Sequence, residues 1–425
     1  MQPGAPGGPA PSGQGAPLTP ATQAQPALTY LDNAATTYPK PPEVIAAVRA
    51  CLDQSLTVQR STVPTALRGQ GGDGGAAFRG DEVLRRCRAK LARFFGARFP
   101  EEMIYTYSAT DGLNIAINGV IRPGGHVIIT PLEHHSVMRP LHHLRERLGV
   151  SWSELPADEM GVVDPDDVPR LVRRDTCAVI VNWVSNVSGT LQPVAEIGRW
   201  TRELELPYIV DGAQYTGTHP IDMQQAGCDA CAQPAHKALF SLPGLGVLYV
   251  RREFDMQPWR IGGTGYRSDL VMQPDERPMR FEAGTPNVPA IVGLDAALDW
   301  FEQVKVENIQ LHCAALIERL IAGLAEIPRV AVIGPPPSLE RGFVVSFTLD
   351  DASGAPVDPL VVSQVLAERF GISTRAGLHC APTAHHHFGT LKRGGTVRFS
   401  VSYFTTPQQV EYALSAVREV AAELA

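Results

Sequence analysis

The chain has 425 residues, of which 44% are hydrophobic and 19% charged, and its formal net charge is −7. A chain of this length exceeds a single simple core, so two domains of unequal size are expected. The acidic balance and the lack of an apolar run of about eighteen residues argue against nucleic-acid and membrane partners.

The first 27 residues are predicted to form a disordered tail, because they hold seven prolines, five glycines and no charged side chain. Such a segment buries too little apolar surface to order itself. It has neither the basic start of a signal peptide nor the arginines of a transit peptide. The seven cysteines follow no disulfide spacing, so we expect reduced thiols in a cytoplasmic protein.

Regular structure is predicted from Tyr30 onward. Two helices are expected over 41–54 and 81–96, with a mobile Gly-rich loop over 60–80 between them. Apolar strands and amphipathic helices then alternate, with strands at 103–108, 126–130, 177–185, 207–213, 228–233 and 245–250 and helices at 110–121, 136–149 and 194–205. This alternation is typical of a parallel α/β sheet, in which ligands bind beyond the carboxyl ends of the strands.

The carboxyl-terminal part reads as a smaller α+β unit. It begins with a long helical stretch over 289–326. Strands at 342–349 and 396–404 and helices at 358–370 and 407–424 follow.

Two cysteines of the larger part, Cys228 and Cys231, have the spacing of only half of a zinc or redox motif. We therefore interpret both as small hydrophobic residues of a strand.

Four loops at strand ends carry candidate functional side chains. Thr110 lies where a strand meets a helix, which suits a phosphate but also an ordinary N-cap. Asp211 ends an apolar strand, where a buried carboxylate needs a cationic partner such as a protonated pyridine nitrogen. Taken alone, Asp211 could equally be a metal ligand or a helix cap. Lys237, after His236, could bond a carbonyl cofactor or be a solvated lysine. His134 could stack on a cofactor or belong to a surface pair. In this chain order the set is specific for pyridoxal 5′-phosphate (PLP).

Several stretches of the sequence carry a family resemblance, and in chain order they read YLDNAATTYPKPPEVI, EHHSV, VSNVSGT, VDGAQ, AHK, RFEAGTPN and TRAGLHCA. From about Leu28 onward the chain resembles the cysteine desulfurases, which belong to the class V aminotransferase group of fold-type I PLP enzymes. The resemblance implies a large, mainly parallel-sheet domain over 28–298 that binds PLP, and a smaller α+β domain over 299–425. The first residues of the large span could pack on the small domain.

The resemblance assigns the groups that would hold the ring of PLP. Lys237 would bind the cofactor as a Schiff base and later move the Cα proton of the substrate. Asp211 would pair with the pyridine N–H, and Gln214 would donate a hydrogen bond to the phenolic oxygen. His134 would stack on the ring and could protonate intermediates.

It also assigns the groups that would hold the phosphate and the substrate. Thr110 and His236 would bind the phosphate, joined by Thr285 from the second subunit of a homodimer. Asn186 and Arg398 would bind the substrate, and Arg398 would take its α-carboxylate as a bidentate pair.

Cys380 falls at the sulfur-accepting position of the family. Its thiolate would attack the sulfur of L-cysteine and leave L-alanine and an enzyme persulfide. Arg375 in the substrate site, or a protonated His379, would favour the thiolate. The sulfur would then pass to an acceptor protein, and iron–sulfur cluster assembly is one of the pathways that use such enzymes.

Two other interpretations remain open from the sequence. The first is another class V enzyme, such as a cysteine or selenocysteine lyase or an aminotransferase-like epimerase, which would share Lys237 and Asp211 but not need Cys380. The second is a non-catalytic scaffold that binds zinc or iron through His379, Cys380 and His385–His387. The sequence itself favours no metal site, because these residues lack a recognised ligand spacing.

Overall fold

The computed structural model describes residues 28–53 and 74–424. Its larger sheet has seven strands in the order β2-β8-β7-β6-β5-β3-β4. The strands are β2 (Met103–Thr106), β3 (His126–Ile129), β4 (Ser151–Glu154), β5 (Thr176–Asn182), β6 (Tyr208–Asp211), β7 (Ala230–Pro234) and β8 (Gly246–Val250). Only β8 runs antiparallel to its two neighbours, and the other pairs are parallel. The expected mainly parallel sheet is therefore present.

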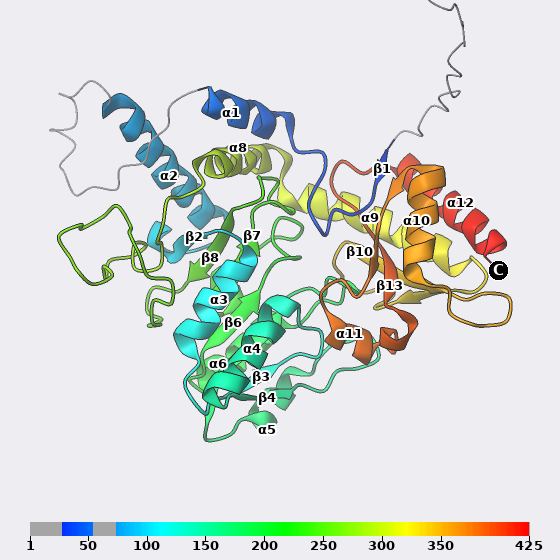
Figure 1. Cartoon of the computed structure of the whole chain (residues 1–425), viewed down its shortest axis with the longest axis horizontal. Coiled ribbons are helices and arrows are strands. Elements are labelled where there is room, and N and C mark those ends of the chain that lie inside the picture. Colours follow the sequence, from blue (N-terminus) through cyan, green and yellow to red (C-terminus); the bar gives the residue numbers. More distant parts are fainter. Residues whose placement is uncertain (1–27, 54–73, 425) are drawn as a thin grey trace, which may run out of the picture.

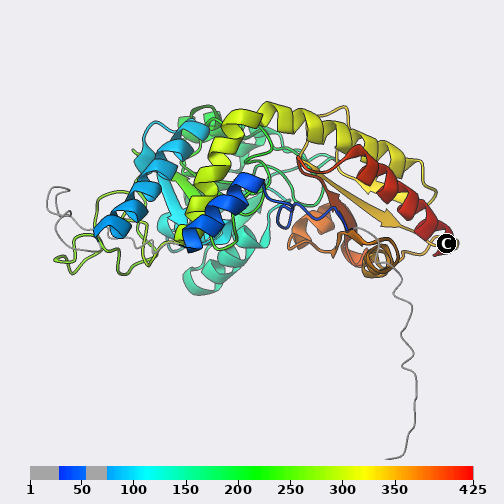
Figure 2. The same cartoon turned by 90° about the horizontal axis from the view of Figure 1, so that it is seen from above.

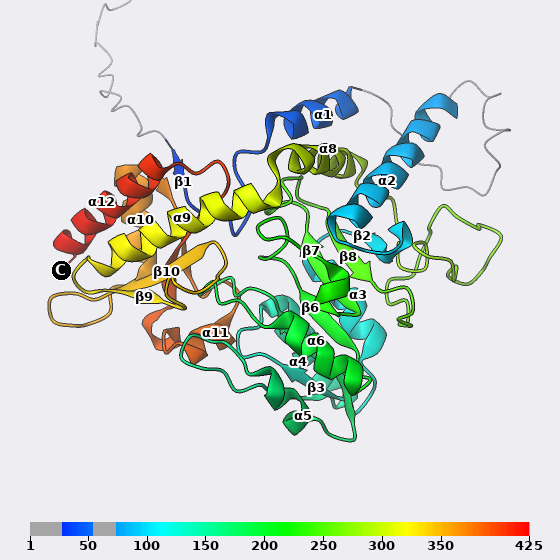
Figure 3. The same ribbon diagram turned by 180° about the vertical axis from the view of Figure 1, so that it is seen from behind.

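Helices cover both faces of this sheet (Figure 1 and, from behind, Figure 3). They are α1 (Pro42–Leu52), α2 (Gly74–Phe94), α3 (Ala109–Val120), α4 (His135–Leu148), α5 (Val168–Leu171), α6 (Val194–Glu203), α7 (Met223–Ala226) and α8 (Val288–Val304). Successive strand residues point to opposite faces, so β6 contributes Ile209 to the core under α3 and α4 and Tyr208 and Val210 to the core on the other face. Both faces of the sheet are thus buried.

The smaller unit is built on a four-stranded antiparallel sheet in the order β12-β13-β10-β9. Its strands are β9 (Val330–Ile333), β10 (Val344–Leu349), β12 (Arg375–Gly377) and β13 (Thr396–Ser400), and its helices are α9 (Val306–Ala325), α10 (Pro359–Phe370), α11 (Pro382–His387) and α12 (Pro407–Glu423). Near this unit, β1 (Thr29–Tyr30) pairs in parallel with β11 (Ile372–Ser373). Figure 2 shows α8 and α9 following one another from the large sheet to the small one.

Two of the predicted helices differ from the structure. The stretch over 289–326 is two helices, because Lys305 between them has a φ of 68° that an α-helix does not accommodate. The helix predicted to begin at 81 begins at Gly74, inside the span expected to be a loop. The rest of that loop over 60–73 and the tail over 1–27 lie outside the described residues.

The other predicted elements are found within a few residues of their expected bounds. Both Cys228 and Cys231 are buried free thiols, as expected, but only Cys231 lies in the strand β7, which begins at Ala230. The limits 28–298 and 299–425 for the two domains stay a prediction. In the part of the chain that the structure describes, none of the helices is long and apolar enough to cross a bilayer.

Candidate active site

A cavity of about 230 Å³ lies beyond the carboxyl ends of β5, β6 and β7. The amino ends of α3 and α4 close it on one side, and residues of β12, β13 and the loop before α11 close it on the other. All of the predicted site residues except Thr285 line it, namely Thr110, His134, Asn186, Asp211, Gln214, His236, Lys237, Arg375, Cys380 and Arg398. Side chains up to about 290 positions apart in the sequence therefore share one chamber, at the edge of the sheet where parallel α/β folds bind ligands.

Lys237 and Asp211 place an amine and a carboxylate in the depth of this cavity. Asp211 is the last residue of β6, and its carboxylate accepts a hydrogen bond of 3.0 Å from the backbone N–H of Ala213. Burial raises the pKa of Asp211, against the opposing effects of that hydrogen bond and of Lys237. Burial lowers the pKa of Lys237 to about 8, and the nearby Asp211 limits the drop. Lys237 is thus an amine that becomes neutral close to physiological pH.

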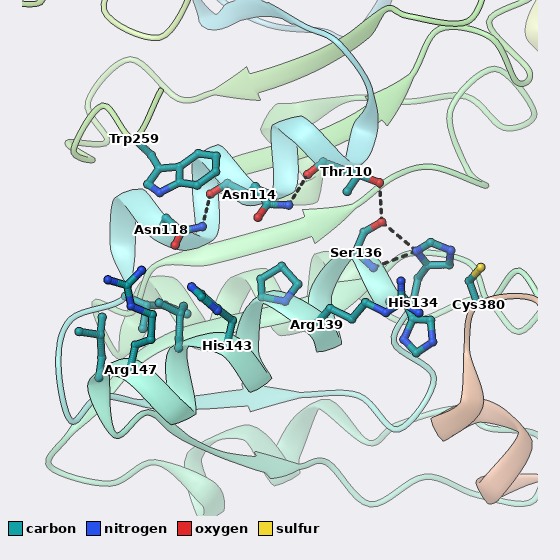
Figure 4. Close-up of a pocket in the computed structure, with 15 residues that line it drawn as sticks. Thr110, Asn114, Asn118, His134, Ser136, Arg139, His143, Arg147, Trp259 and Cys380 are labelled. Carbon is teal, nitrogen blue, oxygen red and sulfur yellow. Dashed lines mark hydrogen bonds between the residues drawn. The ribbon is translucent and has the colours of Figure 1, made fainter. Parts of the chain in front are cut away.

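His134 is a neutral ring with a defined tautomer. Its Nδ1 accepts the backbone N–H of Ser136 at 3.1 Å at the start of α4, so the ring proton lies on Nε2. Burial first, and then the positive charge of Lys237, lowers the pKa of His134 to about 3. The Ser136 hydroxyl lies 2.9 Å from Nδ1 and 2.7 Å from Thr110 Oγ1, and Figure 4 shows this chain of hydrogen bonds.

The amino end of α3 and His236 form the anion-binding end of the cavity. Ser108 caps α3 by accepting the N–H of Asp111, and Ser108, Ala109 and Thr110 all line the cavity. Unpaired N–H groups at a helix start attract anions. His236 Nδ1 is buried without a hydrogen-bond partner among the described residues, and burial lowers the pKa of its ring to about 4. A neutral imidazole here can donate one hydrogen bond to a bound phosphate.

Arg398 on β13 is the buried cation of the site. Its Nη2 donates to Asp32 Oδ1 at 2.8 Å and its Nη1 to the carbonyl of Asn186 at 3.0 Å, while Nε has no partner among the described residues. Arg375 lies directly opposite on β12. Like charges in opposite strand positions destabilise a sheet unless an anion lies near them. The pair suits a substrate carboxylate, although Asp32 already takes one end of the guanidinium that was expected to bind it bidentately.

Cys380 lies in a left-handed turn that the large domain holds in place. His379 and Cys380 have φ values of 49° and 59°. Asn186 Nδ2 donates to the carbonyl of His379 at 2.7 Å, and the N–H of His135 donates to the carbonyl of Cys380 at 2.8 Å. The thiol is exposed, and it lies beside His134 in Figure 4. A sulfur atom here can meet both the cavity and an external partner.

His379 does not supply a positive charge to this turn. Burial first, and then Arg398, lowers the pKa of His379 to about 2, and its Nε2 lies 2.9 Å from Thr396 Oγ1. The expectation of a protonated His379 is therefore wrong, because the ring is buried between the turn and β13. Arg375 and Arg398 remain the cations that face the cavity on this side.

The remaining predicted residues have the following surroundings. Gln214 donates one amide hydrogen to the carbonyl of Ala34 at 3.0 Å, and its second amide hydrogen has no acceptor among the residues that the structure describes. Thr285 is exposed and lies outside the cavity of its own chain, where its carbonyl accepts a hydrogen bond from Tyr107 at 3.2 Å. Its contribution to a second subunit stays a prediction.

The histidines after Cys380 have structural contacts. His385 Nδ1 lies 2.7 Å from Thr390 Oγ1, and His387 Nε2 lies 2.9 Å from the carbonyl of Asp158. Within residues 28–53 and 74–424, no three His, Cys, Asp or Glu side chains come close enough to hold a metal ion. The scaffold that binds a metal through His379, Cys380 and His385–His387 therefore has no site in these residues.

Comparison with known proteins gives the family. The model for aminotransferase class-V matches residues 29–413. The chain belongs to this family. Among curated class V relatives, a probable cysteine desulfurase of Methanothermobacter thermautotrophicus is 32% identical and covers 92% of this chain and 94% of its own. A cysteine desulfurase of Pectobacterium atrosepticum is 31% identical, over 92% of this chain and 93% of its own.

Solved structures agree with this assignment. The apo cysteine desulfurase of Thermococcus onnurineus NA1 has a TM-score of 0.81 at 29% identity and covers 93% of this chain and 95% of its own. The cysteine desulfurase CsdA of Escherichia coli has a TM-score of 0.80 at 26% identity, with the same coverage. The resemblance to cysteine desulfurases and the fold-type I class are both confirmed.

Two residues of this class V site were missed by the sequence reasoning. Ser136 links His134 to Thr110, and Asp32 pairs with Arg398. Both lie inside stretches that carried the resemblance, EHHSV and YLDNAAT. A search for polar residues next to the assigned ones would have found Ser136, but Asp32 is 366 positions away from its partner.

Proposed function

We propose that the protein is a PLP-dependent cysteine desulfurase that converts L-cysteine to L-alanine and receives the sulfur on Cys380 as a persulfide. The observation that carries the proposal is one cavity that holds the low-pKa amine of Lys237, the buried carboxylate of Asp211 and the exposed thiol of Cys380. The cysteine desulfurases among the relatives of the chain support the same reaction.

The residues present fit PLP. The α3 amino end, Thr110 and the unpartnered His236 Nδ1 suit the phosphate, and the buried Asp211, which forms no ion pair among the described residues, suits a protonated pyridine nitrogen. Lys237 suits covalent attachment because burial favours its neutral amine. When bound, PLP withdraws electrons from the Cα of the amino acid and makes its proton removable.

Three residues then move protons and sulfur. Lys237, once free of the cofactor, takes the Cα proton of the substrate as a neutral amine. His134 holds its proton on Nε2, and the tautomer is fixed by Ser136. The thiolate of Cys380 forms an S–S bond with the substrate sulfur while the Cβ–S bond breaks. A proton delivered to Cβ completes the methyl group, and the protonated Lys237 returns a proton to Cα to give alanine.

The substrate site is built from the two facing arginines. Arg398 and Arg375 attract the α-carboxylate of L-cysteine, and Asn186 holds both the carbonyl of His379 and Arg398 in place. The carboxylate would relieve the repulsion between the two guanidinium groups. Binding of the substrate and placement of the Cys380 turn therefore depend on the same asparagine.

Cys380 distinguishes this reaction from the other class V reactions. A lyase that releases sulfide directly, or an epimerase, has no use for an exposed thiol in the cavity. Here the thiol is held in a strained left-handed turn by two hydrogen bonds from the large domain. We therefore favour sulfur transfer over the lyase and epimerase alternatives.

The proposal extends to the assembly and its surroundings. A homodimer would bring Thr285 of a second copy toward the phosphate end, and a sulfur-acceptor protein would meet the exposed Cys380, with iron–sulfur cluster assembly as one destination. The seven free cysteines suit a reducing, cytoplasmic compartment.

Replacement of Lys237 by Ala tests the proposal. We expect the variant to lose the visible absorbance of bound PLP and all formation of alanine from L-cysteine, because none of the other described residues that line the cavity is a lysine. Lys392→Ala, which removes an exposed lysine, is the matched control and should retain both properties. Alanine formation at the wild-type rate by the Lys237 variant would refute the assignment of the cofactor.

A further inference from the structure

The loop that carries Lys237 is held by a segment from the start of the chain. The carbonyl oxygen of His236 accepts from Lys40 Nζ at 2.6 Å, from Thr36 Oγ1 at 3.1 Å and from the backbone N–H of Thr37 at 3.3 Å. A carbonyl oxygen has two lone pairs, and the contact from Lys40 is the shortest of the three. Lys40 is therefore the main partner of the peptide group that precedes Lys237.

Lys40 also reaches the peptide group that follows Lys237. Its Nζ donates to Thr37 Oγ1 at 2.7 Å, and that hydroxyl lies 2.8 Å from the carbonyl oxygen of Lys237 but 3.3 Å from that of His236. The hydroxyl has one hydrogen and donates it to the nearer oxygen. The carbonyl groups on both sides of the Lys237 Cα are thus connected to the Nζ of Lys40, directly for His236 and through Thr37 for Lys237.

The environment of Lys40 is unusual for a lysine. The side chain is half-buried, and burial alone lowers its pKa to about 7. It forms no ion pair with any residue in 28–53 or 74–424. Placing an ammonium group away from water without a carboxylate is unfavourable. Burial therefore favours the neutral amine, whose N–H groups can still donate to the His236 carbonyl and the Thr37 hydroxyl.

We propose that Lys40 is a positioning residue for Lys237, because it fixes both peptide groups beside the Lys237 Cα and thereby sets where the amine lies in the cavity. This inference rests on the proposed role of Lys237. Lys237 lies in a turn between β7 and β8, in which its carbonyl also accepts the backbone N–H of Phe240 at 2.8 Å. The contacts of Lys40 and Thr37 attach this turn to the amino-terminal segment. Reaction rates are sensitive to displacements of about 1 Å at a catalytic group.

Replacement of Lys40 would have a different effect if its role were purely structural. If Lys40 only attached the amino-terminal segment to the large domain, its loss would lower the melting temperature and leave the folded site unchanged. If Lys40 positions Lys237, its loss lets the loop move and admits water to the amine. The pKa of Lys237 would then rise from about 8 toward the ordinary lysine value of 10.5.

The test compares Lys40→Met, Lys40→Arg, Thr37→Val and the exposed-lysine control Lys392→Met. In the cofactor-free proteins, trace acetylation at a series of pH values, with the Lys237 peptide quantified by mass spectrometry, gives the pKa of Lys237 without need of activity. In the PLP-loaded proteins, the kcat and KM for L-cysteine are measured. We expect Lys40→Met to raise the Lys237 pKa by about one unit and to lower kcat about tenfold or more with little change in KM.

The other variants give the contrast. Lys40→Arg should keep most of the wild-type pKa of Lys237 and most of the kcat. The guanidinium can still donate to the carbonyl oxygen of His236 and to the hydroxyl oxygen of Thr37. Thr37→Val removes the hydroxyl that links Lys40 to the Lys237 carbonyl but leaves the direct bond from Lys40 to the His236 carbonyl, so it should give a smaller shift in the same direction. Unchanged Lys237 acetylation and kcat in folded Lys40→Met would overturn the proposal.

If Lys40→Met does not fold, the other two variants decide. A wild-type Lys237 profile in Thr37→Val, or a profile in Lys40→Arg that is shifted more than in Thr37→Val, would overturn the proposal. A failure of the proposed function is recognised separately, because Lys237→Ala would then retain alanine formation whatever the Lys40 variants do.

Discussion

Lys237 shows how burial sets the chemistry of a single side chain. The amine lies in the cavity with Asp211 as the nearby opposite charge, and burial outweighs that charge, so its pKa falls to about 8. His134, His236 and His379 are affected by the same burial and stay neutral, with pKa values of about 3, 4 and 2. Positive charge in the site therefore comes from the arginines, and the neutral amine is available for covalent chemistry.

The pH dependence of cofactor uptake follows from this pKa. The neutral amine, which attacks a carbonyl, predominates above the pKa, so the rate of PLP uptake by the cofactor-free protein should rise with pH and level off above a midpoint near 8. Rapid-mixing measurements of visible absorbance give this midpoint. Asp211→Asn removes the charge that raises the Lys237 pKa and should move the midpoint to lower pH. A wild-type midpoint near 10.5, the ordinary lysine value, would contradict the account.

The sequence identified most of the residues of the site but not their contacts. Lys237, Asp211 and Cys380 could be found because each lies in a local motif next to a strand end. The pairing of Arg398 with Asp32 could not, because it joins positions 366 residues apart. The charge state of His379 depends on burial that only the folded chain defines, and for this reason the expectation of a protonated ring was wrong.

At the scale of an element, the start of α3 depends on a close contact with β8. A Cβ at Gly246 would lie 2.4 Å from the carbonyl carbon of Ser108, the residue that caps α3. Only a glycine allows β8 to run this close to the turn that leads into the phosphate end of the cavity. The anion site is therefore built by the packing of a strand as well as by the helix.

Gly246→Ala should disturb this element. The added methyl group must displace the turn or the strand, which costs about 1–3 kcal/mol of stability and weakens the binding of PLP. Thermal unfolding and equilibrium titration with PLP measure the two effects. Gly263→Ala is the matched control, because a Cβ there meets nothing within 4 Å. Equal PLP affinity in the Gly246 variant and the wild type would show that the contact does not shape the site.

Element boundaries were the weaker part of the sequence prediction. Hydrophobic periodicity located α3, α4 and β5–β8, because these elements are amphipathic or fully buried. The break at Lys305 within the predicted helix over 289–326 was missed, since it comes from one residue with positive φ and leaves the apolar pattern intact. The strand β4 was missed because its sequence, SWSE, has no apolar run. The strand β9 does have one, VAVI, but this run is only four residues long and partly exposed, and it was overlooked.

At the scale of the whole molecule, Arg398 joins three parts of the chain. It lies on β13 of the small sheet, pairs with Asp32 near the amino terminus and donates to the carbonyl of Asn186 after β5 of the large sheet. The Cys380 turn is held by the same asparagine. The proposed binding of the substrate and the contact between the two sheets at the cavity therefore involve the same cation.

Arg398→Lys tests whether the positive charge of Arg398 is sufficient or whether the hydrogen bonds of its guanidinium group are also needed. A lysine keeps the charge but cannot bond Asp32, Asn186 and a carboxylate at once, so kcat/KM for L-cysteine should fall about tenfold to a hundredfold through loss of one or two charged hydrogen bonds. Steady-state kinetics measure this. Arg319→Lys, in an exposed pair with Glu411, is the control and should change little. A wild-type KM in the Arg398 variant would argue against its role in substrate binding.

The central claim is that sulfur from L-cysteine passes to Cys380. The most direct measurement is a single turnover of the PLP-loaded protein with L-cysteine, in which alanine and protein-bound persulfide are quantified together and the persulfide is located by peptide mass spectrometry. The account predicts equal amounts of both, with the persulfide on Cys380, and no persulfide in Cys380→Ala although that variant still binds PLP. Release of sulfide by Cys380→Ala at the wild-type rate, or a persulfide on another cysteine, would contradict it.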